Sequence, residues 1–554
     1  MKQNRSKNLF YAAIATCLFA VIIVPVITVF LEAVMQDGRL DFTKAVQTIG
    51  APDNLTTIAN SMILGVLVVI LSSIIATPLA FILTRTSFAK KRWLDIVLMI
   101  PFMTPPYISS MGWILFMQKK GLFQQCFPFT GHFSEGFFSL AGLTIVMSFH
   151  VFPFMTTILK NAILNIGSNL EESGSVFGGG IWYRLKRITL PLLTGNYAIG
   201  MLLVFVKTLS EYGTPATLGK RIGFYVFTTD IHRYATTSPI DFGKASSLSS
   251  VLVGICMVMW LLQNYVTART SYNLVGAKGN RAGQNKASGK AEFLSGFYLA
   301  LVVLIAIGIP YFSVITTSLI NLRGYGLAPG NFTGKHYVEL FTDNSKGIRA
   351  ILTSTGLAVG VATAASVIGT GIVVAIRRAK RWKGVIEIEA LIPEMIPNIV
   401  LVIGMMLFWN RVYKAVPIYN TMIFMVLVYV VMFLPYTIQY VSSALMQIGE
   451  SLTAAARVSG AAGWYTFRRV TLPLVMKGVM SGWMMIFIIV FRELVAASLI
   501  APPNVLTVST FIVREFEQGS VSVGMAMAVI CVGLTTTALI ALNQAIDRDK
   551  SRNL

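Results

Sequence analysis

Apolar residues along this chain occur in long runs that short polar and basic segments separate, which is typical of a protein that crosses a membrane many times. A helix needs roughly 20 apolar residues to cross the hydrocarbon core of a bilayer. The fold is therefore predicted to be all-α, a polytopic membrane protein. Runs of sufficient length predict twelve spans, at residues 9–35, 60–84, 94–117, 138–158, 195–217, 244–266, 293–318, 350–376, 385–409, 419–440, 474–498 and 521–544.

Composition agrees with this pattern and narrows the possible functions. The 554 residues are 55% hydrophobic and 12% charged, and the net charge of +22 lies in short basic clusters between apolar runs, as in cytoplasmic loops. This distribution argues against a nucleic-acid-binding surface, and the four scattered cysteines argue against a disulfide framework. The first run is too long for a signal peptide and has no A-x-A cleavage site, so we interpret it as a span.

Basic residues also predict the orientation. Both ends of the chain are basic, so we expect both termini in the cytoplasm of a bacterial inner membrane. The bias is incomplete, because loops predicted on the outer side still carry Lys119, Lys120, Lys220, Arg221, Arg323 and Lys335.

The second half of the chain repeats the first. Trp182-Tyr183 and Trp464-Tyr465 lie 282 residues apart, as do Glu211 and Glu493, whereas the prolines Pro101 and Pro393 lie 292 apart. Each half has six spans, an even number, so the two copies are expected to share one orientation. The predicted domains are residues 1–267 and 293–554, with a flexible cytoplasmic linker at 268–292 that is rich in Gly, Ser, Asn and Lys.

The linker contains Ser288-Gly289-Lys290-Ala291, which superficially resembles a phosphate-binding loop. Ala291 stands where Ser or Thr should hold Mg²⁺, and Gly283 is one place too early for the G-x-x-x-x-G-K pattern. We therefore predict no ATP site, no catalytic residue and no metal site in this chain.

Two polar loops are long for a membrane protein. The first motif loop is residues 160–191 and the second motif loop is residues 446–473, and each contains a helix of small residues, a glycine and a basic amphipathic stretch. A small-residue helix with a central glycine allows another surface to approach closely, which favours a docking element. An amphipathic helix lying on the lipid surface is the alternative, but it does not explain the small residues or their repetition.

The pattern Glu-Ala-Ala, three residues, Gly, nine residues, Ile-x-Leu-Pro resembles the cytoplasmic loop signature of permease subunits of ATP-binding-cassette importers. Both loops are similar to it, although Ser173 and Gly174 replace the alanines of the first and Ala454 and Val470 replace Glu and Ile in the second. The matching positions are Glu172, Gly178, Ile188, Leu190, Pro191, Ala455, Ala456, Gly460, Leu472 and Pro473.

This resemblance implies two fused permease domains whose loops dock on two copies of a cytoplasmic ATPase subunit, which would hold the ATP and Mg²⁺. It also implies an external substrate-binding protein as a partner. The missing acid at Ala454 implies that the two docking sites are unequal. The segment Glu211–Gly219 and the fused format look like iron(III) importer permeases, with relatives that carry 2-aminoethylphosphonate, thiamine or polyamines as alternatives.

Charged residues within the predicted spans suggest a pathway or gate, because charge at membrane depth is costly. Those residues are Glu211, Arg492, Glu493 and Glu394, and Pro153 and Pro435 are expected to kink their spans. Lys207, four residues before Glu211, is predicted to pair with it. The alternative is that these charges are structural, and His150 is more simply an interhelical contact.

A secondary transporter driven by an ion gradient is a different class that also has twelve spans. It would use intramembrane carboxylates such as Glu211, Glu394 and Glu493. The paired motif loops favour the importer.

Overall fold

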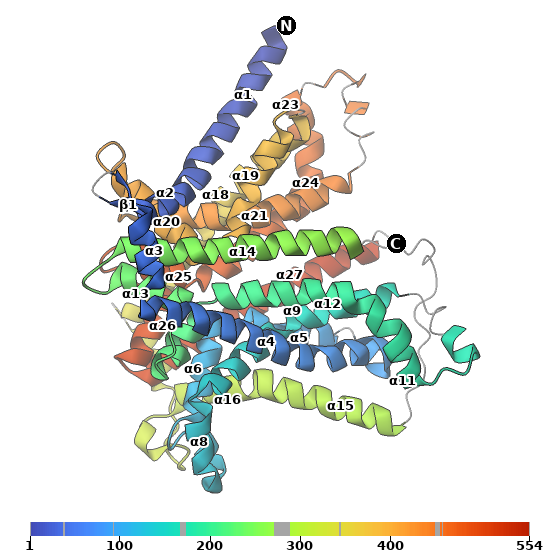
Figure 1. The fold of residues 1–554 in the computed structure, drawn as a ribbon, viewed down its shortest axis with the longest axis vertical. Helices are drawn as coiled ribbons and strands as arrows, with labels where there is room; N and C mark the ends of the chain where they lie inside the picture. Colours follow the sequence, from blue (N-terminus) through green and yellow to red (C-terminus); the bar gives the residue numbers. More distant parts are fainter. Residues whose placement is uncertain are drawn as a thin grey trace. The chain divides into compact units, whose positions relative to one another are not determined.

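The computed structural model is almost entirely helical (Figure 1). It describes the chain except residues 1, 37–38, 92, 167–172, 271–288, 343–344, 380, 449–451, 453–454, 457, 462 and 553–554. Among the described residues, ten helices are long and apolar enough to cross a membrane, or up to twelve if each of two bent helix pairs is one span. The prediction of an all-α polytopic protein is confirmed.

The two bent pairs replace the predicted straight spans at 94–117 and 385–409. Helices α5 (Trp93–Met103) and α6 (Pro106–Met117) meet at 85°, and α19 (Lys383–Met395) and α20 (Asn398–Arg411) meet at 112°. Proline disfavours helical geometry in the residue before it and has no N–H to donate. Pro105 and Pro397 stand at the two breaks, which accounts for the bends.

The chain divides into two compact units, and neither is one half of the sequence. The unit formed by residues 50–230 and 254–336 is built on α4, α9 and α12 of the first half together with α15, η6 and α16 of the second. Its elements are α4 (Pro52–Arg85), η2 (Ser87–Lys90), α5, α6, α7 (Leu122–Cys126), η3 (Pro128–Thr130), α8 (Gly131–Phe137), α9 (Leu140–Asn165), α11 (Ile181–Arg184), η4 (Leu185–Thr189), α12 (Leu190–Ser210), η5 (Pro215–Gly219), most of α14 (Phe242–Thr270), α15 (Gly289–Val303), η6 (Leu304–Gly308), α16 (Ile309–Leu319) and η7 (Arg323–Tyr325).

The other unit is formed by residues 1–49, 231–253 and 337–554, so it combines the first span with the second half. Its elements are α1 (Lys2–Leu18), η1 (Phe19–Ile23), α2 (Val24–Val34), the hairpin β1 (Met35–Gln36) and β2 (Arg39–Leu40), α3 (Phe42–Gly50), most of α13 (Phe227–Thr236), α17 (Lys335–Phe341), α18 (Lys346–Arg378), α19, α20, α21 (Met422–Met446), α23 (Gly463–Thr466), η8 (Phe467–Thr471), α24 (Leu472–Phe491), α25 (Val495–Ile500), α26 (Val508–Glu517) and α27 (Val521–Arg552).

The first span of each half therefore packs with helices of the other half. In one unit α2 packs on α20, and in the other α16 packs on α6. Both contacts pass over a glycine: a Cβ at Gly404 would lie 2.5 Å from the carbonyl oxygen of Pro25, and one at Gly112 would lie 2.7 Å from that of Pro310. A side chain at either glycine would separate the helices, so the same close approach occurs once in each unit.

The apolar core of the 50–230 unit shows the same mixture of halves. Leu79 and Phe152 of the first half are fully buried there, and they cluster with Leu299 and Val302 of α15. Because these residues are far apart in sequence, the compact units do not coincide with the predicted domains 1–267 and 293–554, which describe the repeat in sequence. The predicted linker lies largely outside the described residues.

Candidate functional site

Both motif loops have the same backbone geometry in their described residues. Residues 173–176 are helical, Gly178 has φ +79°, and Gly179 N–H donates to the carbonyl oxygen of Gly174 at 2.9 Å. In the second loop Gly460 also has φ +79°, and Ala461 N–H donates to the carbonyl oxygen of Ala456 at 3.0 Å. Each is a helix C-terminus closed by a left-handed glycine, the geometry of a Schellman motif. Glu172 and Ala454 lie outside the described residues.

This geometry gives the motif glycine a conformational role. A Cβ at Gly178 or Gly460 would meet nothing within 4 Å in this chain, so packing within the chain does not require glycine at either position. The left-handed backbone does, because only glycine adopts it at little energetic cost. The open space beside each glycine is also consistent with the predicted docking, which remains a prediction.

Close packing inside the first motif loop occurs at a different glycine. A Cβ at Gly174 would lie 2.7 Å from Cδ1 of Ile188, so the small helix rests directly on the motif isoleucine. Ile188 belongs to η4, which continues into α12. The small helix is therefore in direct contact with the segment that leads into this span.

Apolar side chains project from the small helices. Val176 is 84% exposed and Phe177 is 89% exposed, and Val458, which matches Val176, is 89% exposed. Apolar residues that point away from the chain are typical of a surface that another protein covers.

The motif prolines follow a π-turn in both loops. Leu190 N–H donates to the carbonyl oxygen of Leu185, five residues back, and Leu472 N–H donates to that of Phe467. Pro191 and Pro473 have no N–H for the carbonyl four residues back, and one wider turn relieves the clash of the ring with it. The same π-turn stands before Pro25 and Pro310 in the first spans.

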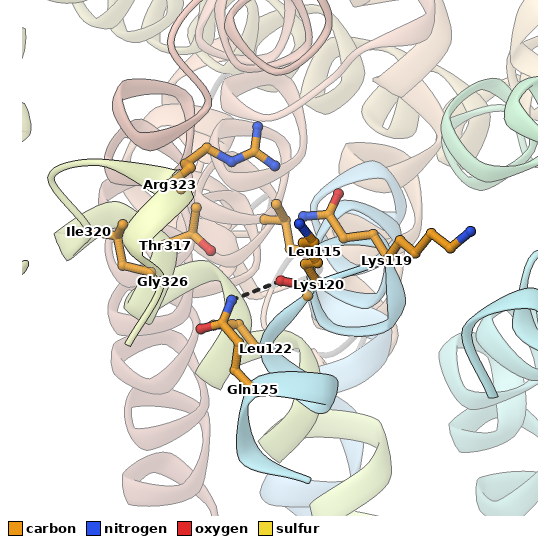
Figure 2. A pocket seen from close by; sticks show the side chains of 12 residues that line it. Leu115, Lys119, Lys120, Leu122, Gln125, Thr317, Ile320, Arg323 and Gly326 are labelled. Atoms are coloured by element: carbon orange, nitrogen blue, oxygen red, sulfur yellow. Dashed lines mark hydrogen bonds between the residues drawn. The ribbon is translucent and has the colours of Figure 1, made fainter. Parts of the chain in front are cut away.

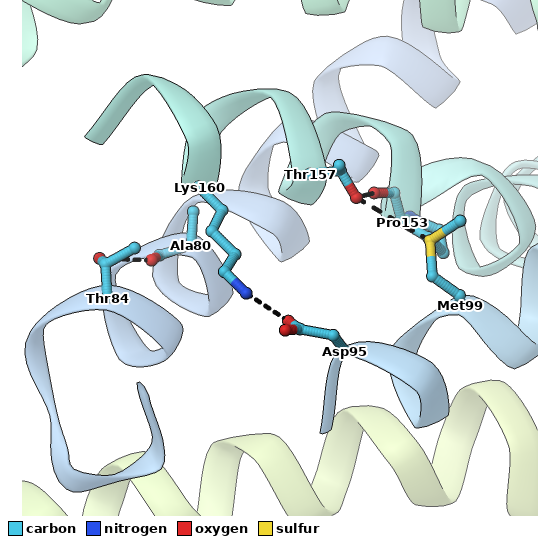
Figure 3. Close-up of polar contacts among 7 residues, drawn as sticks. All are labelled: Ala80, Thr84, Asp95, Met99, Pro153, Thr157 and Lys160. Carbon is cyan, nitrogen blue, oxygen red and sulfur yellow. Dashed lines mark hydrogen bonds and ion pairs between the residues drawn. The ribbon is translucent and has the colours of Figure 1, made fainter. Parts of the chain in front are cut away.

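The first motif loop has an additional anchor. Lys160, at its beginning, lies in α9 and pairs through Nζ with Oδ1 of Asp95 near the start of α5 (Figure 3). At the corresponding positions the second half has Ser442 and Glu387, so this ion pair is not repeated.

Glu211 and Glu493 occupy equivalent positions just beyond the ends of two spans. The helices α12 and α24 end at Ser210 and Phe491, so the predicted spans 195–217 and 474–498 extend too far. Glu493 accepts hydrogen bonds from the N–H groups of Val495, Ala496 and Ala497 at 2.7–3.2 Å. Its Oε2 also accepts from the Tyr429 hydroxyl at 2.8 Å.

Glu211 is held in the same way by the backbone that follows it. Its carboxylate accepts from the N–H of Thr214 at 3.0 and 3.2 Å, and its backbone oxygen accepts from Oγ1 of Thr228 at 2.7 Å. The backbone oxygen of Glu493 likewise accepts from Oγ of Ser509. These contacts favour the structural interpretation, in which each carboxylate caps the segment after its span. The pairing of Lys207 with Glu211 stays a prediction, and Lys207 Nζ lies 5.9 Å from the ring centre of Phe154.

A further hydroxyl holds the chain beyond each of these two spans in place. Ser61 of α4 accepts from the N–H of Phe227 at 2.9 Å, and Ser354 of α18 accepts from the N–H of Val508 at 2.8 Å. Our reading of the sequence missed Ser61, Ser354 and Tyr429, because isolated hydroxyl residues in apolar helices carry no distinctive signal.

Glu394 lies beside the break between α19 and α20. It is exposed, and Nε2 of Gln439 on α21 donates to its carboxylate. In the first half the equivalent residues are Phe102 and Thr157, and the Phe102 ring packs against Phe154 with centres 4.2 Å apart. A carboxylate at this position of the break therefore occurs in one half only.

The helices α9 and α21 change character along their length. Residues 142–156 and 424–438 contain no exposed side chain, whereas Thr157, Asn161, Gln439 and Ser443 are exposed near the ends that lead into the motif loops. Polar groups exposed along a span indicate water rather than lipid. Pro153 and Pro435 are buried inside these helices, and Arg492 is half-buried directly before Glu493.

The residues that the structure describes contain no group of three or more His, Cys, Asp or Glu side chains that could hold a metal ion. His150 is buried, with its ring centre 5.9 Å from that of Phe102, which agrees with an interhelical contact.

Comparison with known proteins gives matches over both halves. The family model described as "Binding-protein-dependent transport system inner membrane component" matches residues 76–272 and 367–552. The ferric transport system permease protein FbpB of Actinobacillus pleuropneumoniae is 22% identical over 536 residues, which cover 94% of this chain and 75% of that protein. The Fe(3+)-transport system permease protein FbpB 2 of Haemophilus influenzae is 22% identical over 501 residues, which cover 89% of this chain and 90% of that protein. The sulfate transport system permease protein CysT of Escherichia coli is 21% identical over 44% of this chain.

Proposed function

Because the chain belongs to the family of inner membrane components of binding-protein-dependent transport systems, we propose that it forms the pathway of an iron(III) importer. Members of this family have no ATPase activity. ATP would be hydrolysed by two copies of a separate cytoplasmic subunit, and an external binding protein would deliver the substrate.

The observation that carries this proposal is the pair of motif loops. Each has a small-residue helix closed by a left-handed glycine, and each projects an apolar side chain, Val176 or Val458, away from the chain. Two equivalent elements suit two copies of one partner. The second class considered, an ion-gradient transporter, gives these loops no role.

The structure also suggests how docking would move the spans. Force on the small helix would reach η4 through the contact between Gly174 and Ile188, and η4 leads into α12 without a break. Rotation of α12 would act on its far end, where Glu211 holds the following segment. The same elements recur in η8 and α24, so both halves would respond together to ATP-driven closure.

Each unit would present to the substrate the polar residues exposed near the loop end of one helix, α9 or α21. The proposed pathway residues are Glu394, with its partner Gln439, and Arg492, while Glu211 and Glu493 hold the outer ends in place. Iron(III) is supported by the names of relatives that match most of the chain, and 2-aminoethylphosphonate, thiamine, polyamines and sulfate are the competing substrates.

Reconstitution tests this proposal. The chain is purified with a candidate ATPase subunit, placed in liposomes that contain ATP, and given binding proteins loaded with iron(III), sulfate, phosphonate, thiamine or polyamine. We expect the iron(III)-loaded protein to stimulate ATP hydrolysis and radioactive iron uptake. Stimulation by a binding protein loaded with another ligand would identify that ligand as the substrate in place of iron(III). Absence of any stimulation would contradict the proposal that the chain belongs to an importer.

The competing transporter class is tested with the chain alone. Liposomes that contain only this chain are given a pH or Na⁺ gradient and each free substrate in turn. We expect no uptake, because no step of the proposed mechanism uses such a gradient. Uptake under these conditions would support the secondary transporter.

A further inference from the structure

A basic pocket lies between two loops of the 50–230 unit, at the ends of α6 and α16 that lie on the predicted outer side (Figure 2). Its volume is about 280 Å³. The walls include Lys119 and Lys120 after α6, Thr317 at the end of α16, and Arg323 in η7. These are three of the basic residues that interrupt the charge bias between the two sides of the membrane.

The other unit shows what occupies the equivalent place. Pro25 matches Pro310 at an offset of 285 and Gly404 matches Gly112 at an offset of 292, because both pairs make the same close contact. By these offsets Glu32 corresponds to Thr317, and Arg411 corresponds to Lys119. In that unit Nη2 of Arg411 pairs with Oε2 of Glu32. The basic residue is thus present in both units, whereas the carboxylate is present in one.

The pocket therefore lies where a carboxylate would complete the repeated ion pair. Lys119 Nζ instead lies 3.7 Å from Glu135, with both side chains at least 75% exposed, so that contact is weak and does not fill the pocket. Arg323 is exposed in the pocket wall, and partial desolvation lowers the pKa of its guanidinium. A carboxylate beside Arg323 would accept charge-assisted hydrogen bonds from it.

The pocket is also held open by fixed contacts. Nε2 of Gln125 donates to the carbonyl oxygen of Lys120 at 2.8 Å, and the N–H of Leu327 donates to Oε1 of Gln125 at 2.9 Å. Gln125 therefore joins the two loops that form the walls, and Figure 2 shows it below the pocket with the Arg323 guanidinium above. A preformed site of this kind loses little entropy when a ligand binds.

We propose that this pocket receives an Asp or Glu side chain of the external binding protein when that protein docks. This inference rests on the proposed function, because it requires such a partner on the outer side. The comparison of the two units indicates a carboxylate as the ligand, since the partner's carboxylate would take the place that Glu32 fills in the other unit.

Two substitutions test the pocket in the complete complex. The chain, its ATPase subunit and the binding protein that stimulates the wild type are reconstituted in phosphatidylcholine liposomes, which have no net charge. Arg323→Gln removes the cation, and Thr317→Glu supplies the carboxylate from within the chain. We expect each to raise the half-saturating concentration of binding protein about tenfold, with unchanged basal ATP hydrolysis.

Matched controls separate charge from shape. Thr317→Gln has the same size as Thr317→Glu without the charge, and Lys335→Gln removes a basic residue outside the pocket. We expect both to keep the wild-type half-saturating concentration, and we expect Arg323→Gln to weaken its salt dependence. Restoration of tight binding by Arg323→Glu with an acid-to-lysine change in the binding protein would identify the contact.

Two results would overturn the proposal: unchanged half-saturation in both pocket variants, or an equal rise with Thr317→Gln and Thr317→Glu. If no binding protein stimulates the wild-type complex, the proposed function fails instead.

Discussion

At the scale of single residues, each motif glycine has a left-handed backbone conformation that favours glycine, and each lies at an open surface. Gly178 and Gly460 share φ +79°, and neither has an atom within 4 Å of its would-be Cβ. A side chain at these positions therefore acts first on the backbone of the small helix. It acts on a partner only if the partner covers the glycine.

Substitution by side chains of similar size distinguishes these effects. Asparagine tolerates left-handed geometry better than other residues with side chains, whereas valine is strongly disfavoured there, by about 1 to 2 kcal/mol. We expect Gly178→Asn to retain most binding-protein-stimulated ATP hydrolysis and Gly178→Val to lose most of it. The control is Gly180, which has open space and no left-handed backbone, so Gly180→Val should be tolerated. Equal loss with Asn and Val at Gly178 would show that the partner needs the bare glycine.

The capping carboxylates lead to a second prediction at this scale. Glu493 accepts from three backbone N–H groups and a tyrosine hydroxyl, and Glu211 accepts from backbone N–H groups of the segment that follows it, that of Thr214 among them. A hydrogen bond to a charged group contributes about 1.5–3 kcal/mol. We expect both Glu→Ala changes to lower the thermal unfolding temperature in detergent, because each removes the carboxylate that caps the segment after its span.

Transport should fall in these two variants only as far as folded protein is lost. A gating carboxylate would behave differently: Glu493→Gln would abolish uptake while the unfolding temperature stayed close to that of the wild type.

At the scale of elements, a π-turn before a proline recurs in both halves. Four of them stand directly before Pro25, Pro191, Pro310 and Pro473, at matching positions of the two halves. One wide turn changes the direction in which later side chains point. The π-turns before Pro191 and Pro473 therefore set how each motif loop is oriented on its span.

Replacement of the motif prolines should change how the motif loops are oriented without lowering the stability of the protein. Alanine at position 191 supplies the missing N–H and favours a regular α-turn. We expect Pro191→Ala with Pro473→Ala to leave the unfolding temperature unchanged or higher, and to reduce ATP-driven uptake several-fold. Pro78 lies inside α4 and is exposed, so Pro78→Ala is the control and should leave uptake unchanged. Full uptake in the double variant would show that the π-turns are not needed for coupling.

At the scale of the whole molecule, each compact unit needs helices from both halves. Residues 1–49 belong with the second half, and residues 254–336, which include α15 and α16, belong with the first. Neither sequence half contains all the helices of one unit. Their fusion in one chain therefore keeps the exchanged spans at high local concentration.

Division of the chain tests this exchange. Residues 1–270 and 289–554 are expressed as two chains with different tags. We expect them to co-purify when expressed together and to aggregate or be degraded when expressed alone, because each alone exposes the surface that the exchanged span covers. Recovery of either fragment as a stable monodisperse protein would contradict the exchange. Deletion of residues 1–49 from the full chain should likewise destabilise the unit that contains the second half.

The sequence by itself determined the helical class, the approximate positions of the spans, the duplicated motif and the membership of the family. These features depend on local physics: a span is an apolar run of sufficient length, a broken span contains prolines, and a left-handed turn needs glycine. Pro105 and Pro397 stand at both bends, although the sequence analysis predicted straight spans there. Gly178 and Gly460 were recognised by spacing, but their left-handed backbone was not.

Only the tertiary structure decided which surfaces meet. All spans are apolar on several faces, so hydrophobicity alone does not indicate that α2 packs on α20 or that α16 packs on α6. Glu211 and Glu493 were recognisable as charges at membrane depth, but their capping role depends on backbone N–H groups that only the folded chain places beside them. The pocket beside Arg323 depends on the same long-range packing. The equivalence of Thr317 and Glu32 follows from the close contact between a glycine and a proline that occurs once in each unit, and the sequence alone does not show that contact.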